Sequence, residues 1–132
     1  MSLNSGKRWL TFDCYDTLVR YTESKSATMT DLISAKGGTK DLVESAWSVF
    51  QSSERRLQTE DFLPLNQVLK TSLKFALNKI GLDPTSSDED KMLSAVKDAD
   101  PFPEVNQVLS ELKQDYKIAI LSNSEPDIIR FN

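Results

Sequence analysis

The stretch Arg8-Trp-Leu-Thr-Phe-Asp-Cys-Tyr-Asp-Thr-Leu-Val-Arg20 combines two kinds of local structure. Its first part, residues 8–13, is rich in aromatic and branched side chains, which is typical of a short β-strand. The polar residues after it predict a tight loop that begins at Asp13. A second apolar run, Tyr116-Lys-Ile-Ala-Ile-Leu121, leads into Ser122-Asn123. Its continuous apolar character predicts a parallel strand that is covered on both faces.

The residues between these two strands have helical character. Apolar residues recur at spacings of three, four or seven within 42–57 and 65–80, as on one face of a helix. An earlier helix is expected near 24–36, and a further one over 105–112 before the second strand. Pro64 is expected to open the helix over 65–80 and Gly81 to end it, because proline suits the first helical turn and glycine the position after the last. Two more helix starts are expected at Thr85–Asp90 and at Ser124, where Asp127 three residues later resembles a capping box.

This order of elements predicts an α/β fold with a parallel sheet and a long helical insertion after the first strand. In such sheets, binding sites form beyond the carboxyl ends of the strands. The loops at Asp13 and Ser122 both follow strands, so they are expected to be neighbours in space although they are far apart in the sequence.

The composition limits the classes of protein to which this chain can belong. A chain of 132 residues with 39% hydrophobic and 27% charged residues predicts one globular domain. The net charge of −4 argues against nucleic-acid binding, which needs a basic surface. No apolar run reaches the ~18 residues of a membrane span, and Met1–Arg8 lacks the apolar core of a secretory signal. The absence of His excludes a Ser-His or Cys-His dyad, and the single Cys favours a reducing compartment, so a cytoplasmic location is expected.

Asp13 is the first candidate for chemistry. A carboxylate at the end of a strand can act as a nucleophile, and the backbone N–H groups of the next loop can face the charge that develops. It can equally serve only to cap its own loop. Ser122 and Asn123 can together hold an anion, or they can belong to an ordinary helix start.

Taken together, Thr11-Phe-Asp-Cys-Tyr-Asp-Thr-Leu18 and Ile118-Ala-Ile-Leu-Ser-Asn123 resemble the first two motifs of the haloacid dehalogenase superfamily. The first resembles its Asp-x-Asp/Tyr-x-Thr motif, and the second its strand ending in Ser or Thr. The helical insertion resembles the cap of the branch in which the cap lies between these motifs. The resemblance implies a partial Rossmannoid core in residues 1–20 and 99–132, and a helical cap in residues 21–98.

The resemblance implies that Asp13 is the nucleophile, that Thr17 orients it, and that Ser122 and Asn123 bind the anionic or leaving group of a small substrate. Phosphatases of the superfamily carry a second Asp two residues after the nucleophile, whereas Tyr15 stands there in this sequence, as in 2-haloacid dehalogenases. The resemblance implies that Tyr15 forms part of an apolar wall around the halogen-bearing carbon; it can equally be a core aromatic whose hydroxyl bonds locally. The implied reaction cleaves a carbon–halogen bond through an aspartyl ester, without a metal or other cofactor. A Mg²⁺-dependent phosphatase is the alternative, because Asp16 stands where dehalogenases usually have Gly.

Dehalogenases of this type clamp the substrate carboxylate with an Arg from the cap. Arg20, Arg55 and Arg56 are the candidates here, although a charged pair such as Arg55-Arg56 is also typical of a solvated helix face. Cys14 is expected to turn away from Asp13 and to be a small buried residue.

The superfamily's third and fourth motifs, which supply a Lys and an acidic or polar group, have no counterpart in this sequence. We therefore expect the chain to be the N-terminal half of a longer enzyme, inactive alone and prone to associate through exposed core surface. Two non-enzymatic alternatives are a signalling receiver whose Asp13 accepts a phosphoryl group and an interaction module made mostly of the helical insertion.

Overall fold

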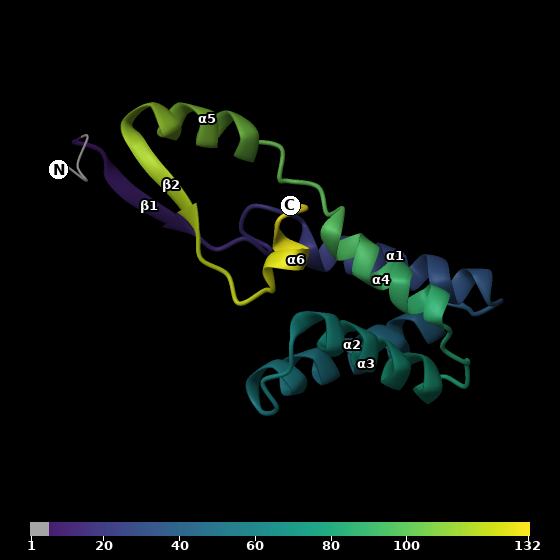
Figure 1. The fold of residues 1–132 in the computed structure, drawn as a ribbon. Coiled ribbons are helices and arrows are strands. Elements are labelled where there is room, and N and C mark those ends of the chain that lie inside the picture. The colour runs from purple at the N-terminus through teal and green to yellow at the C-terminus, as the bar shows by residue number, and fades with distance from the viewer. Residues whose placement is uncertain (1–5) are drawn as a thin grey trace.

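The structure is a computed structural model that describes residues 6–132 (Figure 1). The expectations for the N-terminal segment and for the start of the core at residue 1 therefore lie in part outside the described residues. The elements, in chain order, are β1 (Arg8–Phe12), α1 (Tyr21–Ala35), α2 (Lys40–Thr59), α3 (Leu65–Lys79), α4 (Ser86–Lys97), α5 (Val105–Asp115), β2 (Tyr116–Ile120) and α6 (Pro126–Ile129).

The two strands form a parallel sheet, as the sequence predicts. Leu10 pairs with Ile118 and Phe12 with Ile120, so both strands end at the same edge of the sheet. Helix α5 packs against β2 and turns directly into it. The loops after β1 and β2 leave this edge side by side and run toward α6 and the helices (Figure 1). This arrangement confirms the α/β fold and the expectation that the two polar loops are neighbours.

Helices α1 to α4 form a bundle beside the sheet (Figure 1). Helix α2 packs along α3, and α1 and α4 pack on each other and against this pair. The spacing of the apolar residues explains the bundle, because each helix turns one apolar stripe inward. Most members of this core are completely buried, and burying each large apolar side chain stabilises the fold by roughly 1.5–3 kcal/mol. They include Met29, Ile33, Phe50, Leu69, Leu73, Leu77, Met92 and Val96.

The ends of the helices follow local sequence signals, with one exception. Gly81 has a φ of +78° just after α3, a conformation that favours glycine. Thr85 and Asp88 form a capping box at the start of α4. The capping box expected at Ser124 is wrong: α6 begins after Glu125, and no side chain caps it. The hydroxyl of Ser124 bonds instead to Tyr15.

The strand β2 is less covered than its apolar sequence predicts. Its residues are half-buried, and Ile120 and Leu121 at its carboxyl end are 46% and 66% exposed. Trp9 on β1 is also largely exposed. The expectation of a strand covered on both faces is therefore wrong for the described residues. Within 6–132, no helix has the length and apolar character that crossing a membrane requires.

Candidate active site

The loop after β1 is a tight turn that closes on itself. The carbonyl of Cys14 accepts hydrogen bonds from the N–H groups of Thr17 and Leu18, and the N–H of Asp16 donates to the carbonyl of Val19. Asp16 lies at the bend with a φ of +59°. This is the left-handed region, which glycine adopts freely and which Asp tolerates better than most residues. The turn brings Thr17 back toward the start of the loop.

Asp13 extends from the end of β1 into this turn. The hydroxyl of Thr17 donates a hydrogen bond to Oδ2 of Asp13 over 3.1 Å. The Asp13 side chain is exposed and lines a pocket of about 190 Å³. A carboxylate that is oriented by one donor and open to a pocket can attack a small electrophile. The other residues around the pocket are Tyr15, Asp16, Tyr21, Gln58, Leu65 and Asn123.

Tyr15 lines the same pocket and links the first loop to the second. Its ring stacks on that of Tyr21, with centroids 4.5 Å apart, and its hydroxyl lies 3.1 Å from the hydroxyl of Ser124. Burial raises the pKa of Tyr15, so the phenol stays neutral at physiological pH. The residue therefore provides an aromatic surface and one hydroxyl, and no carboxylic acid.

The second loop contributes one of its two expected residues to the pocket. Asn123 lines the pocket with Asp13. Ser122 is not among the lining residues; its Oγ accepts a 3.3 Å hydrogen bond from the N–H of Ser124, which shapes the loop. Helix α6 begins at Pro126, just after this loop, and is a single short turn.

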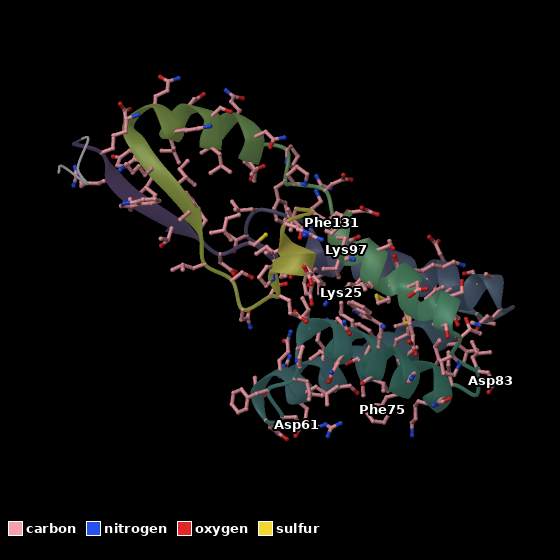
Figure 2. All side chains as sticks on the ribbon, viewed as in Figure 1. Lys25, Asp61, Phe75, Asp83, Lys97 and Phe131 are labelled. Carbon is pink, nitrogen blue, oxygen red and sulfur yellow. The ribbon has the colours of Figure 1, made fainter. Side chains whose placement is uncertain are left out.

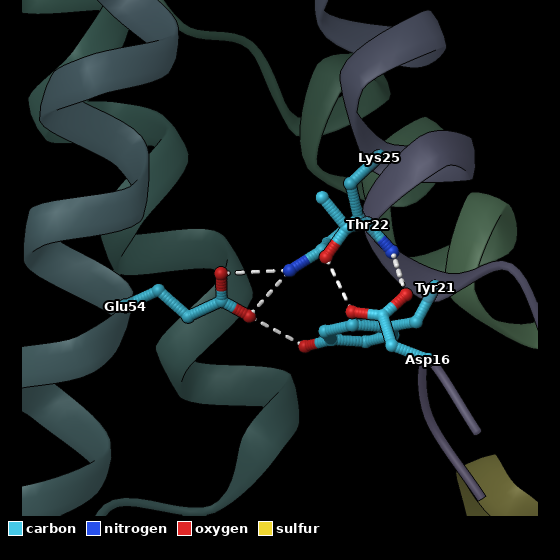
Figure 3. Close-up of polar contacts among 5 residues, drawn as sticks. All are labelled: Asp16, Tyr21, Thr22, Lys25 and Glu54. Carbon is cyan, nitrogen blue, oxygen red and sulfur yellow. Dashed lines mark hydrogen bonds and ion pairs between the residues drawn. The ribbon is translucent and has the colours of Figure 1, made fainter.

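Asp16 has a structural role in the turn, because both its carboxylate oxygens face the start of α1 (Figure 3). Oδ1 accepts a 2.8 Å hydrogen bond from the N–H of Thr22, and Oδ2 accepts one of 2.5 Å from its hydroxyl. Asp16 thus caps α1, whose N-cap residue Arg20 offers no side-chain cap.

The acidic residues of the pocket do not form a metal site in the part of the chain that the structure describes. No three His, Cys, Asp or Glu side chains converge there. Asp13 shares one oxygen with Thr17, and Asp16 is directed to Thr22. These carboxylates alone therefore do not complete the octahedral oxygen shell of Mg²⁺, which in proteins usually keeps several water ligands.

The three arginines considered as carboxylate clamps do not line this pocket. Arg20 lies 3.4 Å from Glu23 and over the ring of Phe102. Arg56 is directed to Asp61 and Phe75, which lie at the surface of the bundle (Figure 2), and Arg55 is exposed.

Cys14 is almost completely buried, as predicted, in a small cluster with Val19 and Ala99 against which Tyr15 packs. Burial, and then the charge of Asp13, raise the pKa of its thiol. The thiol is therefore protonated and shielded, and it has no nucleophilic role in this conformation.

Sequence reasoning missed the residues that the helices bring to the pocket. Tyr21 starts α1, Gln58 lies near the end of α2, and Leu65 starts α3. Nothing in the sequence around these three residues indicates a site. Only the packing of the helical bundle places them around the same pocket as Asp13. A larger hollow of about 590 Å³ lies between α1 and α4, but it includes no residue from either polar loop.

Comparison with known proteins gives a family match and several similar solved structures. A family model described as haloacid dehalogenase-like hydrolase matches residues 7–131. The L-2-haloacid dehalogenase from Xanthobacter autotrophicus is 25% identical, with a TM-score of 0.71, over 95% of this chain and 50% of that chain. The same values hold for that enzyme with chloropropionic acid covalently bound.

A HAD-hydrolase from Bacillus subtilis, YfnB, solved bound to magnesium, has a TM-score of 0.74 over 95% of this chain and 57% of that chain. At 17% identity this likeness shows the fold alone. The chain thus spans about half the length of the solved structures that it matches. No curated protein matches the sequence.

Proposed function

Because the chain belongs to the haloacid dehalogenase-like hydrolases, we propose that Asp13 is the nucleophile of a 2-haloacid dehalogenase-like site. One observation carries the proposal: the Asp13 carboxylate, hydrogen-bonded to Thr17, opens at a strand end into a pocket shared with Tyr15 and Asn123. The substrate class is a small organic anion with a halogen on the carbon next to its carboxylate.

The reaction has two steps. An oxygen of Asp13 attacks the carbon that bears the halogen, the new C–O bond forms as the carbon–halogen bond breaks, and halide leaves with the bonding electron pair. Water then attacks the carbonyl carbon of the resulting ester. The 2-hydroxy acid leaves, the carboxylate of Asp13 is restored, and the water's remaining proton passes to solvent. No redox partner is needed.

The pocket residues suit the first step. Thr17 holds the Asp13 carboxylate in one orientation, and Asn123 offers an amide N–H₂ that can donate to the substrate carboxylate or to the departing halide. Halide is a stable anion that needs no proton to leave. An acid at position 15 is therefore unnecessary, and the neutral ring of Tyr15 can shield the reacting carbon. The role of Ser122 is to shape the loop that presents Asn123.

Two further observations support the proposal. The Xanthobacter L-2-haloacid dehalogenase, 25% identical, has been observed with chloropropionic acid covalently bound, which is the kind of intermediate proposed here. The hydrogen bonds from Thr22 to the Asp16 carboxylate give this residue a capping role, which favours a mechanism without a second catalytic acid. In this assignment, residues 21–98 are the cap and residues 1–20 and 99–132 belong to the catalytic core.

The test uses the protein isolated from its source, at whatever length it has there. Halide release from 2-chloropropionate that persists in EDTA supports the proposal. Phosphate release from a phosphomonoester that EDTA abolishes would replace it with the magnesium phosphatase. Asp13→Asn should abolish halide release, while Asp83→Asn, an exposed carboxylate at the far end of the bundle (Figure 2), should not. A protein with neither activity, whose partner binding survives Asp13→Asn, would be an interaction module.

We also infer that the 132-residue chain associates with itself. Trp9, Ile120 and Leu121 are large apolar side chains that lie exposed on or just after the two strands that the described residues form. Such surfaces drive association, and two-stranded sheets are poor independent cores. Light scattering should show a mass above 14.9 kDa that falls on dilution; a monomer at all concentrations would refute this inference.

A further inference from the structure

A buried ion pair lies behind the aromatic wall of the pocket. Nζ of Lys25 on α1 is 2.6 and 2.7 Å from the two carboxylate oxygens of Glu54 on α2 (Figure 3). Lys25 is 2% exposed and lies inside the bundle (Figure 2). A buried charge pair is a costly way to join two helices, since apolar side chains of similar volume often stabilise as much or more. Stability alone therefore does not explain why this ion pair is present.

Tyr21 connects this pair to the pocket. Its hydroxyl donates a 2.5 Å hydrogen bond to Oε1 of Glu54, the oxygen that Lys25 also contacts (Figure 3). Nζ of Lys25 lies 3.6 Å from the centroid of the Tyr21 ring, a cation–π contact. Tyr21 is thus held at its hydroxyl by Glu54 and at its ring by Lys25.

The ring of Tyr21 also belongs to the pocket of Asp13. Tyr21 lines the pocket with Asp13 and stacks on Tyr15, and Tyr15 in turn bonds Ser124 in the second loop. A continuous series of contacts therefore runs from Glu54 on α2, through Tyr21 on α1, to both polar loops. Each link is a hydrogen bond or a ring stack of defined geometry.

We propose that Tyr21 is a positioning residue of the Asp13 pocket, and that the Lys25–Glu54 pair exists to hold it. The ion pair fixes the position of the Tyr21 ring, and that ring fixes the position of the Tyr15 ring by stacking. Tyr15 in turn fixes the conformation of the loop that carries Asn123. The proposal deepens the proposed function and rests on it, because it concerns the wall against which the substrate of Asp13 would lie.

The decisive variant replaces both charges at once. Lys25→Met with Glu54→Leu keeps the bundle filled and leaves no unpaired charge, so the 132-residue chain should stay folded. Glu54→Leu alone leaves Lys25 unpaired and should be much less stable. Yet the double variant, like the single one, removes the acceptor for the Tyr21 hydroxyl. Comparing the two variants therefore separates the effect on the stability of the fold from the effect on the position of Tyr21.

Two readouts report the pocket wall without turnover. The chain has three tyrosines, so the ring signals of Tyr15 and Tyr21 can be followed by NMR with Tyr116 on β2 as an internal reference. Cys14, the single cysteine, is buried in the cluster against which Tyr15 packs, so its reaction with a thiol reagent measures local opening there. Neither readout depends on catalysis. The positioning role of Tyr21 can therefore fail or hold independently of whether Asp13 is the nucleophile.

In the double variant we expect the Tyr15 ring signals to lose their stacking shift and Cys14 to react about tenfold faster or more, since a hydrogen bond to a charged group is lost. Tyr21→Phe, which keeps the ring and loses the hydroxyl, should move both readouts in the same direction. The matched control is Lys36→Met with Asp88→Asn, which removes a salt bridge of 3.0 Å elsewhere in the bundle. It should leave both readouts unchanged.

A folded double variant with the Tyr15 signals and Cys14 reactivity of the parent chain would overturn the proposal. So would a control pair that changes both readouts as much, because the effect would then follow general loss of stability.

Discussion

The hydroxyl of Thr17 donates a hydrogen bond to Oδ2 of Asp13 across 3.1 Å, four residues along the chain. The tight turn between them makes this contact possible, because the N–H groups of Thr17 and Leu18 both return to the carbonyl of Cys14. One loop therefore supplies the carboxylate and the donor that orients it. In the proposed mechanism this hydrogen bond holds the nucleophile in position.

Replacing Thr17 tests the orienting bond. Thr17→Val keeps the shape of the side chain and removes the donor, so halide release by the source protein should fall by about ten- to a hundredfold if orientation is catalytic. The free energy of unfolding should change by only about 0.5–1.5 kcal/mol, because both side chains are exposed.

Thr17→Ser, which retains the hydroxyl, is the control and should keep most of the activity in the same assay. A Thr17→Val protein as active as the parent would remove Thr17 from the mechanism.

Asp16 is expected to act through the backbone and not through proton transfer. It combines a φ of +59° with the capping of Thr22. Asp16→Ala should lower the free energy of unfolding, measured in urea, by about 1–2 kcal/mol, because it loses the cap of α1 while the turn still requires a left-handed residue. Asp16→Asn should cost less because it retains an acceptor, and Asp16→Gly should lie between, because it loses the cap but relaxes the turn.

A different order, in which Asp16→Gly is the least stable of the three variants, would refute this account of the turn. Halide release that disappears in Asp16→Asn while stability is kept would restore Asp16 as a catalytic acid.

Asp88 should give the bundle a specific sensitivity to acid. Burial by itself raises the pKa of its carboxyl, but hydrogen bonds from Lys36 and Thr85 outweigh this and leave the pKa below its ordinary value of 3.8. A lowered pKa means that this stabilisation is fully present above about pH 4 and is lost as the pH falls through the folded-state value.

Unfolding free energies measured from pH 6 down to pH 2 should therefore fall more steeply for the parent chain than for Asp88→Asn, with the two curves converging in acid. Parallel curves would show that the Asp88 carboxylate does not contribute in this way.

Local sequence signals predict much of this fold for physical reasons. The apolar periodicity of residues 42–57 and 65–80 leaves one stable way to bury each helix, and Gly81 ends α3 because few other residues adopt its φ of +78°. The two polar loops could be placed together because parallel strands share their carboxyl edge. Asp13, Tyr15 and Asn123 do line one pocket.

Other features depend on contacts between distant residues. Lys25 and Glu54 are 29 positions apart, and nothing in either segment marks them as partners. Ser124 has the sequence of a helix cap, but its hydroxyl bonds to Tyr15, 109 positions away. The exposure of β2 also depends on which elements pack on the sheet, which its own apolar run cannot express.

The most direct test of the account asks where the oxygen goes in one turnover. The protein from its source, in excess over 2-chloropropionate, is allowed to react once in H₂¹⁸O, and the tryptic peptide of residues 9–20 is then sequenced by mass spectrometry. The ester mechanism predicts that ¹⁸O appears on Asp13 and that the first molecule of product carries ordinary oxygen. Product labelled with ¹⁸O beside an unlabelled Asp13 would mean that water attacks the substrate directly, and Asp13 would not be the nucleophile.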